Sequence, residues 1–194
     1  MMKKNGKGKE IYNGEIKFEG EYLNGHKIKG KEYINGRLEY EGDYLFDKKW
    51  NGRGYDENGN IIYELIEGTG KVREYNHWNK KLVFDGEYLN GKRNGKWKEY
   101  YFEGNLMFDC EYKNGKKNGK GKHYKLDGEI IFEGDYLNNK RYNGKGKEYY
   151  KDGELIFEGE YLNGERFNGK GKEYNDDEEL IFEGEYINGK KIPK

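Results

Sequence analysis

The chain has 194 residues, and its 37 Lys and Arg balance 37 Asp and Glu, so the formal net charge is zero. This balance argues against nucleic-acid binding, which usually requires a basic surface. No apolar run reaches the roughly 20 residues that a membrane-spanning helix needs. The mean hydropathy of −1.33 would favour disorder, but 16% of the residues are aromatic and they recur at regular intervals.

The chain begins partway through a repeating pattern. Residues 5–10 have the sequence of the second half of a repeat, and the first complete unit starts at Phe18. The pattern breaks between Tyr63 and Lys81, where Asn76–Lys80 matches no other part of the chain, and it is regular from Phe84 onward. We therefore expect one array of about eight units over residues 1–194. An irregular connector near 63–81 would separate a short N-terminal segment from a regular C-terminal one.

The repeated core is an aromatic residue, an acid, a glycine, an acid and a tyrosine, as in Phe157–Tyr161. Successive copies start 21–25 residues apart, a period typical of repeat architectures. Cys110 takes the glycine position in one copy, and the copy at Tyr63 is degraded. The repeat-defining residues are Phe18, Gly20, Tyr22, Tyr40, Gly42, Tyr44, Phe84, Gly86, Tyr88, Phe108, Tyr112, Phe132, Gly134, Tyr136, Phe157, Gly159, Tyr161, Phe182, Gly184 and Tyr186.

Each unit has the pattern of a β-hairpin. Apolar residues alternate with acids over 155–161, which predicts a half-buried strand. Asn163-Gly164 signals a turn, a loop of about six residues follows, and a second strand begins at Asn168-Gly169. Asp152-Gly153 is a tight turn leading into the next copy. The sequence thus predicts an all-β fold, an elongated single-layer antiparallel meander of tandem hairpins.

The glycines suggest close packing. If Phe157 and Tyr161 share a face with Gly169 and Gly171, the glycines leave space on which the rings can lie. On the other face, the acids at 158 and 160 would stand across from the lysines at 170 and 172.

These features resemble the MORN repeat, whose pattern is Tyr-x-Gly-x-Trp, a glycine soon after, and a Gly-x-Gly pair. The resemblance covers about residues 5–190. Phe replaces the first Tyr in most copies, Tyr replaces Trp, and Lys separates the paired glycines, while residues 95–101 lean toward variant MORN-like repeats. Such arrays act as platforms for protein–protein interaction, often at membrane–cytoskeleton junctions, and phospholipid binding has been proposed for them. The resemblance therefore implies a non-enzymatic scaffold with no appended catalytic domain.

Catalytic and metal sites are not expected. The chain has no serine, and Cys110 stands in a glycine position, where we expect a buried structural thiol and not a nucleophile paired with His123. His26, His77 and His123 lie in different repeats, so we expect surface substitutions and no metal cluster. The paired carboxylates recur in every copy, whereas a catalytic dyad needs one special environment. No cofactor is expected.

A basic edge and an acidic edge are predicted along the array. The hairpin loops carry basic residues and the return turns carry acidic ones, as in Asp152–Glu154 and Asp176–Glu179. The candidate interaction edge comprises Lys92, Arg93, Lys116, Lys117, Lys140, Arg141 and Arg166, and Lys190 and Lys191 continue it.

Three binding functions fit this pattern. The first is a scaffold that binds a partner protein, with lateral self-association through the two edges as one form of it. The second is a peripheral binder of anionic phospholipid through the basic edge. The third is a carbohydrate-binding aromatic repeat module. With one cysteine and no signal-peptide pattern, we expect a cytoplasmic protein, at most peripheral to a membrane or the cytoskeleton.

Overall fold

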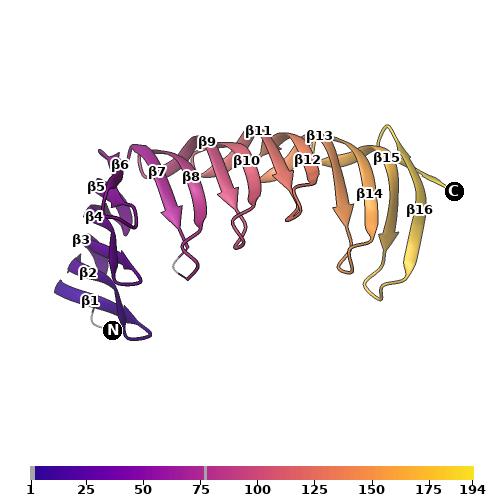
Figure 1. Cartoon of the computed structure of the whole chain (residues 1–194). Helices are drawn as coiled ribbons and strands as arrows, with labels where there is room; N and C mark the ends of the chain where they lie inside the picture. Colours follow the sequence, from indigo (N-terminus) through magenta and orange to yellow (C-terminus); the bar gives the residue numbers. More distant parts are fainter. Residues whose placement is uncertain (1–2, 77) are drawn as a thin grey trace. The chain divides into compact units, whose positions relative to one another are not determined.

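The computed structural model describes residues 3–76 and 78–194, and every regular element in this part of the chain is a β-strand. Seventeen antiparallel strands lie in two sheets, and strands that pair are consecutive in sequence (Figure 1). The prediction of an all-β meander of tandem hairpins is therefore confirmed. The chain divides into two compact units, unit 1 (Met1–Gly104) and unit 2 (Asn105–Lys194).

Unit 1 contains a change of sheet. Its strands are β1 (Gly6–Tyr12), β2 (Glu15–Leu23), β3 (His26–Ile34), β4 (Arg37–Leu45), β5 (Lys48–Tyr55), β6 (Ile61–Leu65), β7 (Gly70–Tyr75), β8 (Leu82–Leu89) and β9 (Lys92–Tyr100). Strands β1–β6 form one sheet in sequence order, and β7 starts the second. Only an isolated bridge between Ile66 and Thr69 closes the turn between β6 and β7. This change falls inside residues 63–81, and between β7 and β8 backbone hydrogen bonds join Asn76 to Lys80 and to Lys81.

Unit 2 is a regular meander. Its strands are β10 (Leu106–Lys113), β11 (Lys116–Tyr124), β12 (Ile130–Leu137), β13 (Lys140–Tyr149), β14 (Leu155–Leu162), β15 (Glu165–Tyr174), β16 (Leu180–Ile187) and β17 (Lys190–Pro193). Each strand from β11 to β16 pairs with the one before and the one after it. The return turns 125–129, 150–154 and 175–179 are closed by backbone hydrogen bonds between their first and last residues.

The hairpin turns are shorter than the sequence suggested. In the hairpin of β14 and β15, Leu162 pairs directly with Glu165, so Asn163 and Gly164 alone form the turn. Their φ angles of +53° and +88° fit a two-residue hairpin turn, which requires positive φ at both positions. The predicted six-residue loop is therefore wrong, because residues 165–168 already belong to β15.

A bulge explains a second difference from the expected pairing. Glu158 lies opposite Lys170 as predicted, but Glu160 lies opposite Asn168 and not opposite Lys172. The register shifts between Glu160 and Tyr161, and a bulge of this kind bends the strand and redirects the side chains that follow. As a result, Tyr161 pairs with Arg166.

The core is the predicted aromatic layer on glycine. Phe18, Phe132 and Phe157 are essentially fully buried. Phe157 pairs with Gly171, and Gly159 pairs with Gly169. A Cβ added at Gly159 would lie 2.1 Å from the carbonyl oxygen of Asn168 and 2.8 Å from Cζ of Phe157. The glycines therefore let strands and rings approach more closely than any side chain would allow.

Candidate functional site

Four of the predicted basic-edge residues lie over the aromatic layer. Because the loop is strand, the second residue after each two-residue turn faces the rings, as the pairing of Arg166 with Tyr161 shows. Their charged groups lie 3.5–5.0 Å from the ring centroids of the first aromatic residue in the same hairpin: Arg93 over Phe84, Lys117 over Phe108, Arg141 over Phe132 and Arg166 over Phe157. The other three, Lys92, Lys116 and Lys140, are exposed at the strand starts.

This arrangement recurs in both units. Lys27 lies 4.2 Å from the ring centroid of Phe18, Lys49 lies 4.8 Å from that of Tyr40, and Lys191 lies 5.6 Å from that of Phe182. Each such contact is worth about 0.5–2 kcal/mol, more where water is excluded. We call this set the cation row: Lys27, Lys49, Arg93, Lys117, Arg141, Arg166 and Lys191.

A row of glutamates accompanies the cation row. Arg166 donates to both carboxylate oxygens of Glu148 at 3.1 and 2.6 Å, and the Tyr161 hydroxyl donates to the same carboxylate. Burial alone would raise the pKa of Glu148, but these hydrogen bonds outweigh it and hold the pKa below its ordinary value. We call the equivalent residues the carboxylate row: Glu10, Glu32, Glu74, Glu99, Glu148 and Glu173.

The two rows link successive hairpins. Lys27 lies 3.1 Å from Glu10, and Lys49 lies 3.2 Å from Glu32. The hydroxyls of the core tyrosines join them, since Tyr22 donates to Glu10 and Tyr186 donates to Glu173. Most of this buried charge is thus neutralised within the fold, and its role is to hold one hairpin on the next.

In unit 2, one repeat lacks the glutamate of the carboxylate row. Where Glu148 and Glu173 follow their Gly-Lys pairs, β11 has His123. The His123 ring is half-buried and stacks on Phe108 with ring centroids 4.0 Å apart, so the expectation of a surface histidine is wrong here. Burial, together with Arg141 and Lys117, lowers the pKa of His123 to about 4. His123 is therefore neutral near pH 7.

The other chemically reactive candidates are structural. Cys110 is buried as predicted, opposite Gly121. His26 is exposed and its Nδ1 lies 2.6 Å from Asp47, while His77 lies outside the described residues. No group of three or more His, Cys, Asp or Glu within residues 3–76 and 78–194 is placed to hold a metal ion.

In unit 1, beside the change of sheet, the repeat pattern has an additional buried glutamate, Glu39. Lys49 contacts Glu32 and also Glu39, whose two oxygens lie 3.1 and 2.9 Å from its ammonium nitrogen. Glu39 is almost fully buried, and burial raises its pKa. The carboxylates around Lys49 outweigh its own burial and raise its pKa, so it stays charged. Glu39 occupies the strand position of Ile156 in the regular copies.

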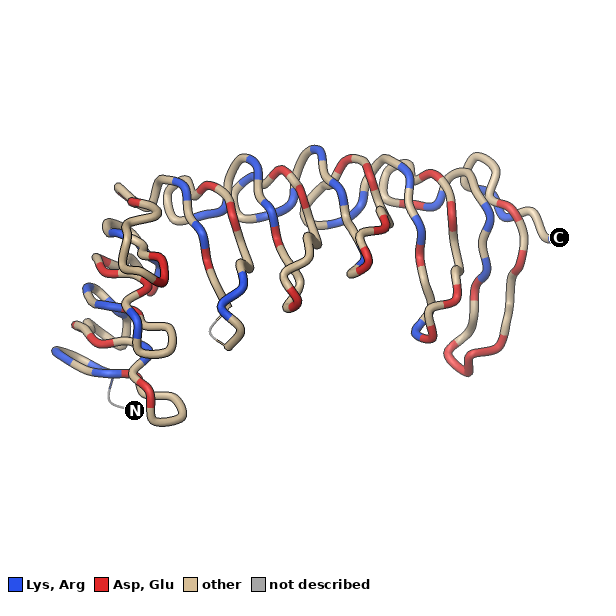
Figure 2. The backbone as a smooth tube through the Cα atoms, in the orientation of Figure 1, with Lys and Arg blue, Asp and Glu red and all other residues tan. Residues whose placement is uncertain are grey.

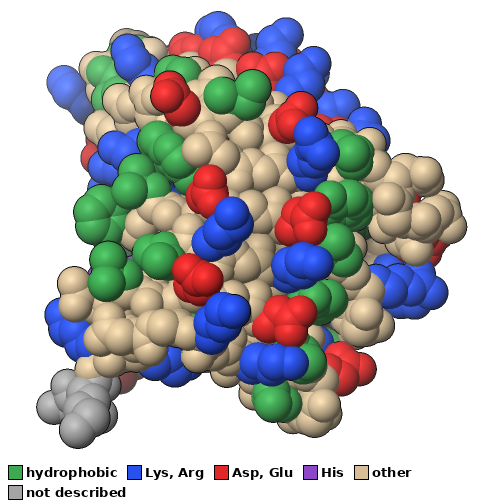
Figure 3. All heavy atoms as spheres, turned by 90° about the vertical axis from the view of Figure 1, so that its left-hand side faces the viewer, with side chains coloured by type: hydrophobic (Ala, Val, Ile, Leu, Met, Phe, Trp, Pro, Cys, Tyr) green, Lys and Arg blue, Asp and Glu red, His purple; other side chains and the backbone are tan. Residues whose placement is uncertain are grey.

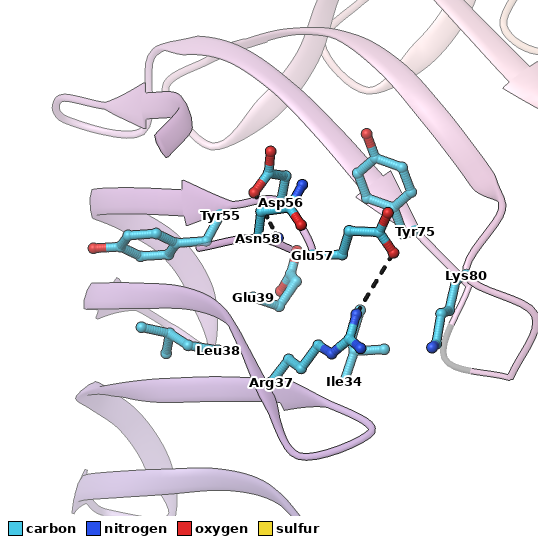
Figure 4. Close-up of a pocket in the computed structure, with 10 residues that line it drawn as sticks. All are labelled: Ile34, Arg37, Leu38, Glu39, Tyr55, Asp56, Glu57, Asn58, Tyr75 and Lys80. Carbon is cyan, nitrogen blue, oxygen red and sulfur yellow. Dashed lines mark hydrogen bonds and ion pairs between the residues drawn. The ribbon is translucent and has the colours of Figure 1, made fainter. Parts of the chain in front are cut away.

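Glu39 also lines a cavity of about 270 Å³ (Figure 4). Arg37 and Glu57 form an ion pair at 3.5 Å, and Figure 4 shows this pair on the side of Tyr75 and Lys80. The Asp56 carboxylate accepts hydrogen bonds from the backbone of the 56–60 turn. Arg37 and Glu57 thus engage each other, and Asp56 is engaged by its own turn.

The sheet face opposite the aromatic layer carries ordinary surface charge pairs. Lys9 lies 3.1 Å from Glu19, Lys31 lies 3.7 Å from Glu41, and both pairs are largely exposed. Figure 3 shows acidic and basic side chains alternating in rows, with hydrophobic side chains on either side of them. Figure 2 shows the same mixture along the strands, and the return turns of unit 2 carry acidic residues. Exposed pairs of this kind contribute little stability.

One exposed apolar residue precedes the hairpin turn in most copies. The exposed fractions are 41–56%, and in most of these hairpins a lysine is the first residue after the turn. We call this set the turn row: Leu23, Leu45, Leu89, Leu137, Leu162 and Ile187.

Comparison with models of known protein families and with curated proteins found no match to this chain. A helix able to cross a membrane is absent from residues 3–76 and 78–194.

Proposed function

We propose that the chain is a non-enzymatic, MORN-like repeat scaffold that binds a partner protein along its hairpin turns. The turn row carries this proposal, because it repeats an exposed apolar side chain at one position where core packing does not require it. In unit 2 the row consists of Leu137, Leu162 and Ile187.

The chemistry of the turns indicates the kind of partner. Leu137 pairs with Lys140, and Ile187 pairs with Lys190, so each of these hairpins presents an apolar group beside an ammonium group. A protein segment that combines apolar and acidic side chains complements this surface. Repeat proteins commonly bind through extended surfaces of this kind, one contact per repeat.

The test compares two triple variants in the full chain. Leu137→Asn, Leu162→Asn and Ile187→Asn together remove the unit 2 part of the turn row. The matched control changes Ile130, Leu155 and Leu180 to Asn, since these residues are 40–50% exposed at the other end of the strands. We expect affinity capture from the source cells to lose its specific protein partners with the first variant only.

A liposome arm separates the lipid-binding alternative. Binding of the wild-type chain to anionic vesicles, lost with the turn-row variant and unaccompanied by a captured protein, would favour a membrane surface over a protein partner. Identical protein capture by both triple variants and the wild-type chain would contradict the proposal.

A further inference from the structure

We propose that His123, Arg141 and Lys117 form a half-buried oxyanion-binding site in unit 2. The site takes a carboxylate or phosphate group in the place that a glutamate side chain fills in the neighbouring hairpin. A free anion and an acidic side chain of another protein are two sources of the same chemistry.

The neighbouring hairpin shows what the site lacks. Glu148 on β13 pairs with Phe157 in the same register as His123 on β11 pairs with Phe132. Glu148 accepts two hydrogen bonds from Arg166, the cation of the following hairpin. The residue equivalent to Arg166 one repeat earlier is Arg141, and its charge acts on the imidazole of His123, which stands where a carboxylate would be expected.

Arg141 keeps unused donor capacity. One of its terminal nitrogens donates to the Lys147 carbonyl at 3.0 Å and to the Tyr161 hydroxyl at 3.4 Å. Arg141 forms no ion pair with any residue that the structure describes, although its guanidinium lies over the Phe132 ring at 5.0 Å. A guanidinium has five N–H donors in a fork that suits an oxyanion. Most of that fork is therefore available to a ligand.

His123 supplies the second donor. Neither ring nitrogen has a hydrogen-bond partner among residues 3–76 and 78–194, and the ring is fixed only by stacking on Phe108. A neutral imidazole keeps one N–H donor. Lys117 lies over the same Phe108 ring at 3.5 Å, and its charge acts on His123 as that of Arg141 does. The repeat has thus lost a carboxylate and kept the cations around it.

The histidine also reports binding. The chain has only three histidines, so selective ¹³C labelling of their rings gives three resolved NMR probes. Inorganic phosphate and acetate are titrated at pH 7 and constant ionic strength, with chloride as the reference salt. We expect a saturable shift of the His123 signal and a higher His123 pKa when the site is occupied, because a bound anion favours the imidazolium. His26 is the internal control, since it lies exposed beside Asp47.

Two variants test the site. Arg141→Gln should weaken binding by at least about tenfold, the effect of losing a charge-assisted hydrogen bond. Lys140→Gln, an exposed neighbour with the same change in charge, should leave binding unchanged. His123→Glu puts a carboxylate of the chain itself in the site, so it should abolish anion binding although every cation is kept. Because this variant lacks the His123 signal, its binding is measured by isothermal titration calorimetry. If Arg141→Gln does not fold, His123→Glu alone decides the test.

A second arm distinguishes the sources. The blocked peptide acetyl-Gly-Glu-Gly-amide should bind at the same site if the ligand is an acidic side chain, and acetyl-Gly-Gln-Gly-amide should not. Binding of phosphate without the peptide indicates a free anion. Equal shifts at all three histidines, or a phosphate affinity unaltered by both Arg141→Gln and His123→Glu, would overturn the proposal.

Discussion

Arg166 and Glu148 form a bidentate ion pair, with nitrogen–oxygen distances of 3.1 and 2.6 Å, that connects β15 to β13 across the intervening strand β14. Burial alone would lower the pKa of Arg166, but the hydrogen bonds to the Glu148 carboxylate outweigh it and raise the pKa above its ordinary value. The Arg166 side chain is 16% exposed and the Glu148 side chain is 32% exposed. The pair therefore links two strands, β13 and β15, that do not pair with each other directly.

Glu148→Gln should lower the free energy of unfolding by about 1–3 kcal/mol, because it weakens charge-assisted hydrogen bonds from Arg166 and Tyr161 in a partly buried place. Urea denaturation followed by circular dichroism measures the change. The control is Glu158→Gln, since that side chain is 60% exposed and lies 3.8 Å from Lys147. Its effect should stay within about 0.5 kcal/mol. Equal effects would show that the carboxylate row is only surface charge.

Gly159→Ala should cost at least about 3 kcal/mol or prevent folding, because the new Cβ would meet the backbone of β15 at 2.1 Å and the Phe157 ring at 2.8 Å. Gly153→Ala is the comparison, since Gly153 has φ +90° and open space around it. That change should cost about 1–2 kcal/mol of backbone strain. Denaturant midpoints compare the two. A larger loss at Gly153 would contradict the role assigned to the aromatic layer.

His123 should make stability depend on pH below neutrality. Its pKa falls from an ordinary 6.5 to about 4 in the folded chain, so between these values the unfolded chain binds more protons. Stability from the neutral imidazole is therefore present above pH 6.5 and is lost as the pH falls toward 4. Allowing for partial exposure, the loss is about 1–2 kcal/mol. His123→Gln should flatten this part of the pH–stability curve, and an unchanged slope would place His123 in solvent.

The sequence predicted the hairpin repeat because two signals are local. Alternating apolar residues predict the strands, and Asn-Gly predicts the turn, with φ +53° at Asn163. The loop was overestimated because residues 165–168 contain no apolar alternation, although they pair as strand. Their register depends on a bulge before Tyr161, which composition does not reveal.

The charged rows were missed for a related reason. Arg166 is next to a turn in sequence, where charge usually means solvent exposure, but the bulge directs it onto Phe157. Aligning the copies with one another would have exposed the signal: a glutamate follows the Gly-Lys pair at 148 and 173, and His123 replaces it once. The same alignment shows Glu39 at a position where the regular copies have an apolar residue, but not that it is buried beside Lys49.

Lys49 and Glu39 give the last prediction. Lys49→Met should cost about 3–5 kcal/mol at pH 7.5, because it leaves the buried Glu39 without its cation beside a second carboxylate, Glu32. Without the lysine, the pKa of Glu39, already raised by burial, should rise further. A carboxyl group whose folded pKa is raised destabilises the fold as the pH rises through that pKa. The variant should therefore recover part of its stability at pH 5, where Glu39 takes up a proton.

The double variant Lys49→Met with Glu39→Leu is the control, and it should be more stable than Lys49→Met at pH 7.5 because the uncompensated carboxylate is gone. Denaturant midpoints at the two pH values measure both effects. A Lys49→Met loss that is small and independent of pH would show that Glu39 is solvated and not part of the buried charge network.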